Sequence, residues 1–372
     1  MVLPKLCFVV PEYNFQTATH FNYLYNFVKN ISRDFDVFLV LEKSRDYPDF
    51  GGGIKIYIQK FRFLPLRVIE NFLVFCYARL AGYRDFYVHY SFLSAFNASM
   101  AVKIFGGRTF YWNCGLPWLY KRRFLRETFE RLVYKSVTFL VTGTEGLKKE
   151  YSAHYSLPLL KIKILPNWID LENFKINRAV SEKIRKDIDP SGRNKILLFV
   201  HRLTKRKGAH YLPEIISGLK NENVILAVIG DGPERLSVEA DIKKRGLSVR
   251  ARFLGNVPNR DIADYFGAAD VFVMPSEEEG FPHVLLEAMA SGTPFVSFSV
   301  GGIKNIIPAE CRKFVVTFGD KNGFINKVRE ILYYNRTEIE QLSDIEKNWV
   351  KKFNLPAVIE EFKNLLYHNP KQ

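Results

Sequence analysis

Short apolar runs, rich in β-branched and aromatic residues, alternate with longer amphipathic stretches along the whole chain. In the first half these runs predict strands at Leu6–Val10, Val37–Glu42, Ile54–Gln59, Phe86–Tyr90, Thr109–Trp112, Val137–Thr142 and Ile162–Leu165. After Asn167 the pattern restarts, with strands at Ile196–Val200, Val224–Ile229, Ala251–Leu254, Val271–Met274, Phe295–Phe298 and Phe314–Val316. Strands that alternate with helices predict parallel sheets covered by helices on both faces, and the restart predicts two of them.

The length of the chain also favours two domains. With 372 residues, 47% hydrophobic and 25% charged, it is larger than one hydrophobic core usually supports and has the composition of a soluble globular protein. We expect an α/β chain with one doubly wound domain over residues 1–167 and another over 168–354. The polar segment Asp170–Asn194 is expected to be the linker. Ligands of doubly wound sheets bind at the carboxyl ends of the strands, so we expect the site in a cleft between the domains.

The most informative stretch runs from Glu279 to Pro294. Pro282 suits the first position of a helix, and the helix is expected to end near Ser291-Gly292. Backbone N–H groups around His283 and Val284 would then favour an anion such as a diphosphate. Glu279 and Glu287 flank that position, and carboxylates beside a phosphate site need hydroxyl donors, which sugars supply. A bare Glu-x7-Glu spacing on a solvated helix is otherwise common by chance.

The whole string resembles the signature of the retaining glycosyltransferases of family 4, also called glycosyl transferases group 1. That family has the GT-B fold, two facing Rossmann-like doubly wound domains with an interdomain cleft. The resemblance implies that Glu279 contacts donor-sugar hydroxyls and acts as a catalytic residue, and that Glu287 binds the nucleotide ribose. The residues between them that would bind the donor are Phe281, Pro282, His283 and Val284. It also implies that the last helix, about residues 355–372, packs back on the first domain.

Two further loops fit the same resemblance. Arg202 and Lys207 follow the strand at Ile196–Val200 and match the family's diphosphate-binding Arg and Lys. The planar guanidinium of Arg can donate two parallel hydrogen bonds to a phosphate, and the ammonium of Lys adds a compact positive charge, so the two suit a diphosphate. Gly230 and Gly232 close the next strand and match a Gly-x-Gly-Pro turn beside the nucleotide, although a simple tight turn would use the same glycines. A basic loop is also commonly just a solvated loop.

The first domain matches the family only in outline. The loop after the first strand lacks the family's glycines, and Thr17 offers a hydroxyl there instead. Asn113 occupies the place of a donor-binding His, while His89 reads as a core histidine. In the second domain Lys304 stands near a position where the family commonly has Glu.

Two Asp-x-Asp pairs, Asp34 with Asp36 and Asp187 with Asp189, resemble the metal site of the other glycosyltransferase fold. The first lies at a strand start and the second in the expected linker, so we interpret both as chance. The resemblance implies a mechanism without a metal or cofactor, in which the substrates are a UDP- or GDP-sugar and an acceptor.

The distribution of charged and apolar residues indicates what kind of acceptor the protein would use. The net charge is +15. Residues 1–166 hold 23 Lys or Arg against 12 Asp or Glu, a net of +11, which leaves +4 for the rest. Two stretches, Lys60–Phe75 and Trp118–Val133, interleave basic and large apolar residues as membrane-surface helices do, although core packing explains apolar faces equally well. They favour docking on an anionic membrane and an acceptor that is a glycolipid or a polyprenyl-linked glycan.

Other features bound the location and the function class. No apolar run approaches the about 20 residues needed to cross a bilayer, and the first ten residues do not read as a secretory signal. The cysteines, Cys7, Cys76, Cys114 and Cys311, lack metal-ligand spacing and are expected to be free thiols. We therefore expect a cytoplasmic protein, peripheral on the cytoplasmic membrane face. A nucleic-acid binder would need a recognisable binding module, and none is visible. An epimerase, a phosphorylase or an inactive scaffold on the same fold stays open.

Overall fold

The computed structural model describes residues 3–14, 22–44, 47–48, 50, 53–119 and 124–367. The chain divides into two compact units. Unit 1 comprises Met1–Pro166 and Pro356–Gln372, and unit 2 comprises Asn167–Leu355. The first boundary falls one residue before the position expected from the sequence pattern.

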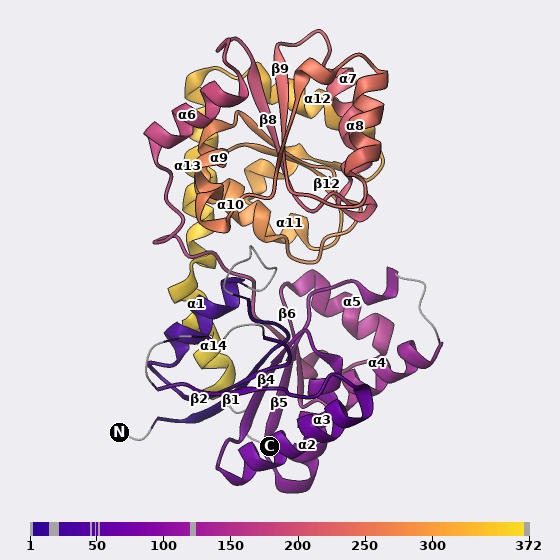
Figure 1. Ribbon diagram of the computed structural model, residues 1–372, viewed down its shortest axis with the longest axis vertical. Coiled ribbons are helices and arrows are strands. Elements are labelled where there is room, and N and C mark those ends of the chain that lie inside the picture. The colour runs from indigo at the N-terminus through magenta and orange to yellow at the C-terminus, as the bar shows by residue number, and fades with distance from the viewer. Residues whose placement is uncertain are drawn as a thin grey trace. The chain divides into compact units, whose positions relative to one another are not determined.

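Unit 1 is built on a parallel sheet with helices on both faces (Figure 1). The sheet has seven strands in the order β3-β2-β1-β4-β5-β6-β7. The strands are β1 (Lys5–Val10), β2 (Asp36–Leu41), β3 (Lys55–Ile58), β4 (Asp85–His89), β5 (Arg108–Trp112), β6 (Phe139–Thr142) and β7 (Ile162–Ile164). The helices are α1 (Asn22–Ile31), α2 (Leu64–Leu80), α3 (Phe92–Phe105), α4 (Phe124–Ser136), α5 (Glu145–Tyr155) and α14 (Leu355–Tyr367).

Unit 2 repeats this architecture with a six-stranded parallel sheet in the order β10-β9-β8-β11-β12-β13. Its strands are β8 (Lys195–Val200), β9 (Val224–Ile229), β10 (Ala251–Gly255), β11 (Val271–Met274), β12 (Phe295–Ser299) and β13 (Val315–Thr317). Its helices are α6 (Arg178–Ile188), α7 (Leu212–Gly218), α8 (Arg235–Lys244), α9 (Ile262–Ala268), α10 (His283–Ser291), α11 (Ile303–Ile306), α12 (Lys321–Leu332) and α13 (Arg336–Val350). The strand order reverses between β8 and β11, which is where doubly wound sheets bind ligands.

The expected strands are confirmed, with ends that shift by one or two residues. The expected linker is wrong. Within Asp170–Asn194 the chain forms helix α6, which packs against α9, and Arg185 pairs with Asp270 at 2.8 Å. Few of the side chains of α6 are buried, so its sequence is polar enough to resemble a linker.

The last helix, α14, belongs to the core of unit 1 and lies beside α1 (Figure 1). The ring of Phe362 is fully buried and contacts Phe8, Phe27 and Tyr87, with centroid distances of 6.4, 5.1 and 4.9 Å. Lys363 pairs with Asp34 at 2.6 Å. This explains the first acidic pair in structural terms, because Asp34 anchors the returning helix.

Removal of this ring is expected to destabilise unit 1. Phe362→Ala leaves a cavity beside the rings of Phe8, Phe27 and Tyr87, and such truncations cost about 3–5 kcal/mol. Urea unfolding followed by circular dichroism should show the loss. Leu160→Ala, at a side chain that is 85% exposed in the same unit, is the matched control and should change stability by less than about 0.5 kcal/mol. Equal stability of the two variants would show that α14 is not part of the core.

Candidate functional site

The loops that follow β8 and β11 bring three polar side chains of unit 2 together around Glu279. Its carboxylate is 4% exposed. Oε1 accepts hydrogen bonds from Lys207 Nζ at 2.7 Å and Ser276 Oγ at 2.8 Å, and it lies 3.1 Å from His201 Nε2. Three groups therefore converge on one oxygen of a buried carboxylate, at the carboxyl ends of the two strands where the sheet reverses.

The second oxygen of Glu279 has a different environment. No described residue donates a hydrogen bond to Oε2, yet this atom is not sealed from solvent. Because Oε1 already has three neighbours, the side chain is held in one position. Oε2 is thus a fixed acceptor that an incoming hydroxyl can use.

The ionisation of this cluster follows from its burial and its charges. Burial by itself would raise the pKa of Glu279, but the Lys207 ammonium and the His201 hydrogen bond outweigh it and hold that pKa well below its usual range. Burial, together with Lys207, lowers the pKa of His201 to about 4. His201 is therefore neutral at pH 7, and its Nε2–H donates to the ionised Glu279. The site combines one carboxylate and one ammonium with a neutral imidazole.

Glycines let the loops approach closely enough to form the cluster. Gly208 follows Lys207 with φ of +71°, and a Cβ there would lie 1.8 Å from the carbonyl oxygen of Pro275. Gly232 would place a Cβ 2.3 Å from the carbonyl oxygen of Leu203, and Gly230 has φ of +116°. Any larger residue would separate these loops. Gly230 and Gly232 thus have a clear structural role in supporting the loop that carries His201 and Arg202.

Helix α10 begins one residue later than expected, at His283, and Pro282 is its N-cap. The extended ψ of Pro282 (117°) excludes it from the helix itself. The expected end is confirmed, since Gly292 adopts the left-handed conformation after Ser291. Pro282 provides no side-chain cap, so nothing from its side chain competes for the amide groups of the first turn.

Glu287 lies in the second turn of α10 and is half-buried. It forms no hydrogen bond or ion pair with any described residue, and burial raises its pKa to about 7. A desolvated carboxyl group without a partner is typical of a site that is completed by a ligand. Hydroxyl donors would stabilise its charged form.

The other expected residues of this stretch differ in character. Phe281 is buried, packs edge-on against Phe353 at 5.6 Å, and its carbonyl accepts a hydrogen bond from Asn167 Nδ2 at 2.9 Å. Val284 is also buried, whereas His283 is half-exposed. Phe281 therefore fixes the turn that presents Glu279 and α10.

Arg202 stands next to His201 in the loop after β8. Its side chain is exposed and forms no ion pair with any described residue. The Arg202 guanidinium can therefore turn toward an anion without first breaking an ion pair with a described residue.

The segment that holds this site is similar to known proteins. Residues 180–349 match the model for glycosyl transferases group 1. The matched segment lies within unit 2 and contains the cluster around Glu279. An uncharacterised glycosyltransferase of Methanocaldococcus jannaschii is 38% identical over 177 residues, 46% of this chain and 45% of its own length. The UDP-Gal:α-D-GlcNAc-diphosphoundecaprenol α-1,3-galactosyltransferase of Escherichia coli is 28% identical over 220 residues, 55% of this chain and 54% of its own. The matches thus span about half of these curated relatives.

The solved structures extend the likeness to both units. The Anabaena protein HepE, determined with UDP and glucose, aligns with a TM-score of 0.80 at 17% identity, over 98% of this chain and 99% of its own. The GT-B fold expected from the sequence is confirmed by this match. Unit 2 contains the motif residues, and unit 1 is the second Rossmann-like domain.

In unit 1 the hydrogen bonds of Asn113 are used within its own domain. Asn113 is 5% exposed, its Nδ2 donates to Tyr134 Oη at 3.0 Å, and its Oδ1 accepts from the Gly115 amide at 2.9 Å. His89 is fully buried and stacks on Trp112 with a centroid distance of 4.2 Å, as expected for a core histidine. Thr17 lies outside the described residues.

The remaining acidic pairs serve local structure. Asp36 accepts from Tyr83 Oη at 3.0 Å, and Asp189 accepts from the Asn194 amide at 2.7 Å. Among the described residues no three His, Cys, Asp or Glu side chains lie close enough to hold a metal ion. None of the described helices is both long and apolar enough to cross a membrane.

Two members of the cluster were not picked out by the sequence pattern. His201 directly follows β8, and Ser276 lies two residues after the end of β11. Both residues lie near the carboxyl ends of β8 and β11, the two strands between which the strand order reverses. This position could have identified them, but only once the strand order was known.

Proposed function

We propose that this protein is a retaining glycosyltransferase that moves a hexose from a nucleotide-diphosphate sugar to a glycolipid or polyprenyl-linked acceptor. The observation that carries the proposal is the buried, ionised Glu279, with Oε1 held by three groups and Oε2 open. The group 1 domain and the relatives that act on sugars support it.

Each element of the unit 2 site has a role toward the donor. Glu279 Oε2 accepts a hydroxyl of the transferred sugar and fixes its orientation. Arg202 and Lys207 neutralise the diphosphate, assisted by the amides at the start of α10. Glu287 accepts the ribose hydroxyls, which stabilises its charged form. The loop of Gly230 and Gly232 lets the nucleotide approach the backbone.

The transfer proceeds on one face of the sugar. The bond between the anomeric carbon and the diphosphate oxygen breaks, and the bond to the acceptor oxygen forms on the same face. The acceptor hydroxyl proton passes to an oxygen of the leaving diphosphate, so no protein base is needed. Cationic stabilisation of the leaving group and orientation of the sugar then carry catalysis, without a metal ion.

The acceptor side of the proposal rests on unit 1 and on the relatives. The curated E. coli relative is named for a diphosphoundecaprenol-linked sugar, and unit 1 carries most of the positive charge of this chain. We propose a peripheral location on the cytoplasmic face of the membrane, where an anionic lipid surface attracts that charge.

Donor binding is tested first by thermal shift. A sugar nucleotide that binds only the folded state at 100 times its Kd adds about 2.7 kcal/mol, which raises Tm by about 5–10 °C for a domain of this size. We expect one or more of UDP-glucose, UDP-N-acetylglucosamine and GDP-mannose to do so. UMP and GMP, which lack the diphosphate, are the controls and should shift Tm much less. No shift with any sugar nucleotide would contradict the proposal.

The product then decides between reaction classes. With the bound donor and a polyprenyl-diphosphate sugar as acceptor, we expect a disaccharide whose new bond keeps the configuration of the donor, as read from its anomeric proton coupling. An altered free sugar nucleotide would instead indicate an epimerase, and a phosphate-dependent sugar phosphate would indicate a phosphorylase.

A further inference from the structure

Helix α2 of unit 1 is apolar on two faces, and only one of them packs in the core. Val74, Phe75 and Ala78 face the domain and are buried. A second stripe, Leu66, Ile69, Leu73 and Tyr77, follows the helical repeat and is exposed, from 44% for Leu66 to 65% for Tyr77. An exposed helical stripe of this size requires a reason beyond folding.

This stripe forms one wall of a groove of about 680 Å³. The opposite wall comes from β2 and from β3, which is the edge strand of the sheet, and from the loop after β3. The apolar lining includes Phe38, Tyr57, Leu66, Ile69, Leu73 and Tyr77. The volume lies in the range of about 300–1,000 Å³ found for small-molecule sites.

Polar groups in the groove are already engaged or are cationic. The buried carboxylate of Glu70 accepts from Tyr57 Oη at 2.8 Å and from the amides of Lys60 and Phe61 at 2.7 and 3.1 Å. These bonds hold the rim loop in place and leave Tyr57 without a spare proton. Apart from Lys60, the side chains of the lining thus offer few free hydrogen-bonding groups to a polar ligand.

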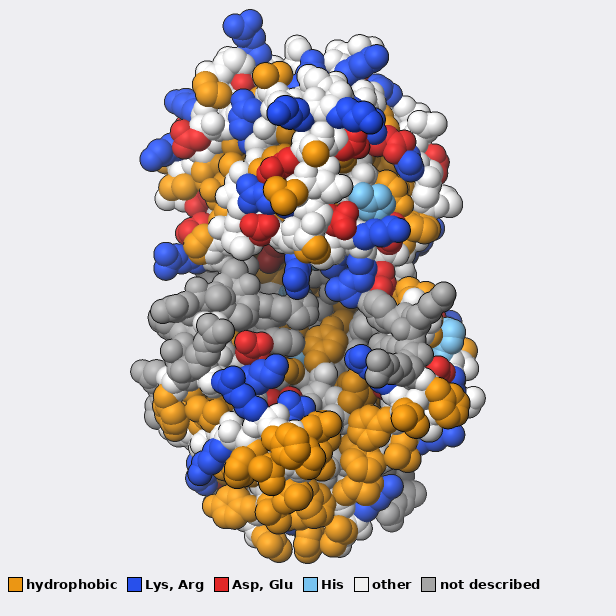
Figure 2. All heavy atoms as spheres, turned by 45° about the vertical axis from the view of Figure 1, so that its right-hand side comes forward, with side chains coloured by type: hydrophobic (Ala, Val, Ile, Leu, Met, Phe, Trp, Pro, Cys, Tyr) orange, Lys and Arg blue, Asp and Glu red, His pale blue; other side chains and the backbone are white. Residues whose placement is uncertain are grey.

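Positive charge lies at the rim. Lys60 lines the groove, and Arg62 follows two residues later on the same loop. Both side chains are exposed, and neither forms an ion pair with a described residue. Figure 2 shows hydrophobic side chains gathered in one broad patch on this unit with Lys and Arg beside it.

We propose that this groove binds the hydrocarbon chain of a phosphorylated lipid, with Lys60 and Arg62 facing its phosphate. An apolar slot with a cationic rim complements a chain that ends in an anionic head group. The inference builds on the proposed function, because it assigns the lipid part of the acceptor to a defined site on unit 1.

Binding of a soluble single-chain lipid tests the groove directly. Isothermal titration calorimetry of the full chain with dodecyl phosphate below its micelle concentration should show one site. Each buried methylene strengthens binding about fourfold, so decyl phosphate should bind on the order of tenfold more weakly. Equal affinity for the two chain lengths, or no binding at all, would overturn the proposal.

Substitutions on α2 separate the groove from a general apolar surface. Ile69→Glu and Leu73→Glu place a carboxylate in the lining at exposed positions and should weaken dodecyl phosphate binding at least tenfold. Leu80→Glu is the matched control, since Leu80 is 72% exposed on the same helix and does not line the groove. It should leave binding unchanged. An equal loss in all three variants would mean that the lipid meets only a flat surface, and the groove would be rejected.

The cationic rim has its own control. The double variant Lys60→Gln with Arg62→Gln should weaken dodecyl phosphate about tenfold and leave dodecyl maltoside, which has a neutral head group, unaffected. Equal loss for both compounds would remove the phosphate from the proposal. The thermal shift with sugar nucleotides should persist in Ile69→Glu, so that failure of the groove and failure of donor binding are distinguished.

Discussion

Replacement of Glu279 by Gln is expected to lower kcat for sugar transfer by about two orders of magnitude or more. The carboxylate has Oε1 fixed by Lys207, Ser276 and His201, which leaves Oε2 as a charged acceptor for a sugar hydroxyl. An amide at this position either donates where it should accept or turns its NH₂ toward Lys207. Loss of one such transition-state contact costs about 3 kcal/mol, which corresponds to this factor. Steady-state transfer with the donor found by thermal shift measures it.

Glu277→Gln is the matched control for this variant. Glu277 lies two residues earlier in the same loop, is 26% exposed at its side chain, and contacts His210 at 3.4 Å and Tyr211 Oη at 3.2 Å. It should retain transfer within about threefold. If Glu279→Gln kept near-normal kcat while folded, Glu279 would be a structural carboxylate and the site assignment would be lost. A change confined to KM would indicate binding without orientation in the transition state.

Much of the fold could be predicted because the physics that sets it is local. Strands buried on both faces of a parallel sheet read as continuous apolar runs, as Val224–Ile229 does. The ends of α10 were nearly correct for the same reason, since Pro282 and Gly292 act through their own backbone preferences. The start of α10 was predicted one residue too early, because proline is compatible both with the N-cap and with the first turn of a helix.

The site could be predicted only in part, because its chemistry depends on distances across the sheet. His201 and Glu279 are 78 residues apart and meet only because β8 and β11 are neighbours. Asn113 resembles a ligand-binding residue in the sequence, and its partner Tyr134 on α4 is visible only in three dimensions. The polar helix α6 was missed because most of its side chains are solvated and only a few positions contact α9.

The α2 groove shows a different limit. The stretch Lys60–Phe75 was interpreted as either membrane-binding or core, and the structure shows two apolar stripes on one helix. The periodicity of apolar residues shows that a helix has apolar stripes, but it does not show which stripe is buried against the rest of the domain. The edge position of β3 answers this question, because no further strand lies beyond this wall among the residues that the structure describes.

Lys207→Met is expected to impair both stability and transfer. The Lys207 side chain is 15% exposed and lies 2.7 Å from Glu279, so its removal leaves a buried carboxylate without its countercharge. Breaking a buried pair in this way costs about 3–5 kcal/mol. The pKa of Glu279 should rise as well, because the largest attractive charge beside it is gone. Urea unfolding measures the first effect, and transfer, expected to fall about 100-fold, measures the loss of diphosphate stabilisation.

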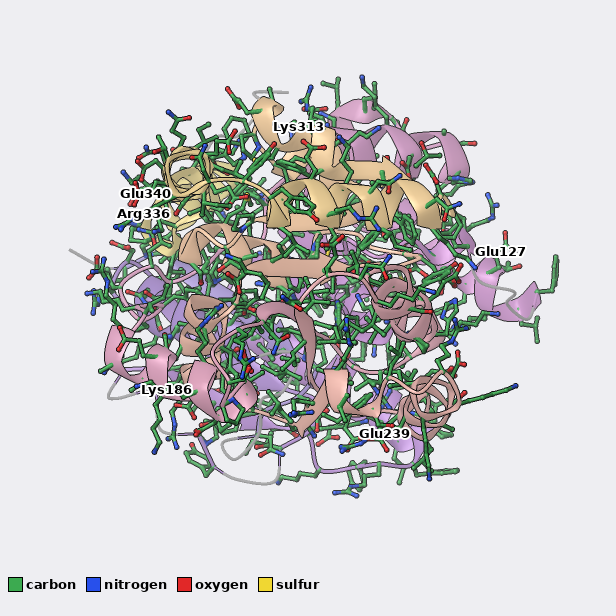
Figure 3. The ribbon with its side chains drawn as sticks, turned by 90° about the horizontal axis from the view of Figure 1, so that it is seen from above. Glu127, Lys186, Glu239, Lys313, Arg336 and Glu340 are labelled. Carbon is green, nitrogen blue, oxygen red and sulfur yellow. The ribbon has the colours of Figure 1, made fainter. Side chains whose placement is uncertain are left out.

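Replacement of the adjacent Arg206 is the control for Lys207→Met, because it also removes a positive charge but does not break the buried pair with Glu279. Its side chain is 53% exposed and lies 3.7 Å from Glu278, so Arg206→Met should cost less stability than Lys207→Met. The exposed pair of Arg336 and Glu340, which lies at the edge of the molecule in Figure 3, should also contribute little to stability, since the two side chains are 91% and 60% exposed.

Combining Lys207→Met with Glu279→Gln should recover most of the lost stability, because no unpaired charge is left buried, while transfer stays low. Recovery of transfer in the double variant would show that the two residues serve only each other, and the donor site would have to lie elsewhere.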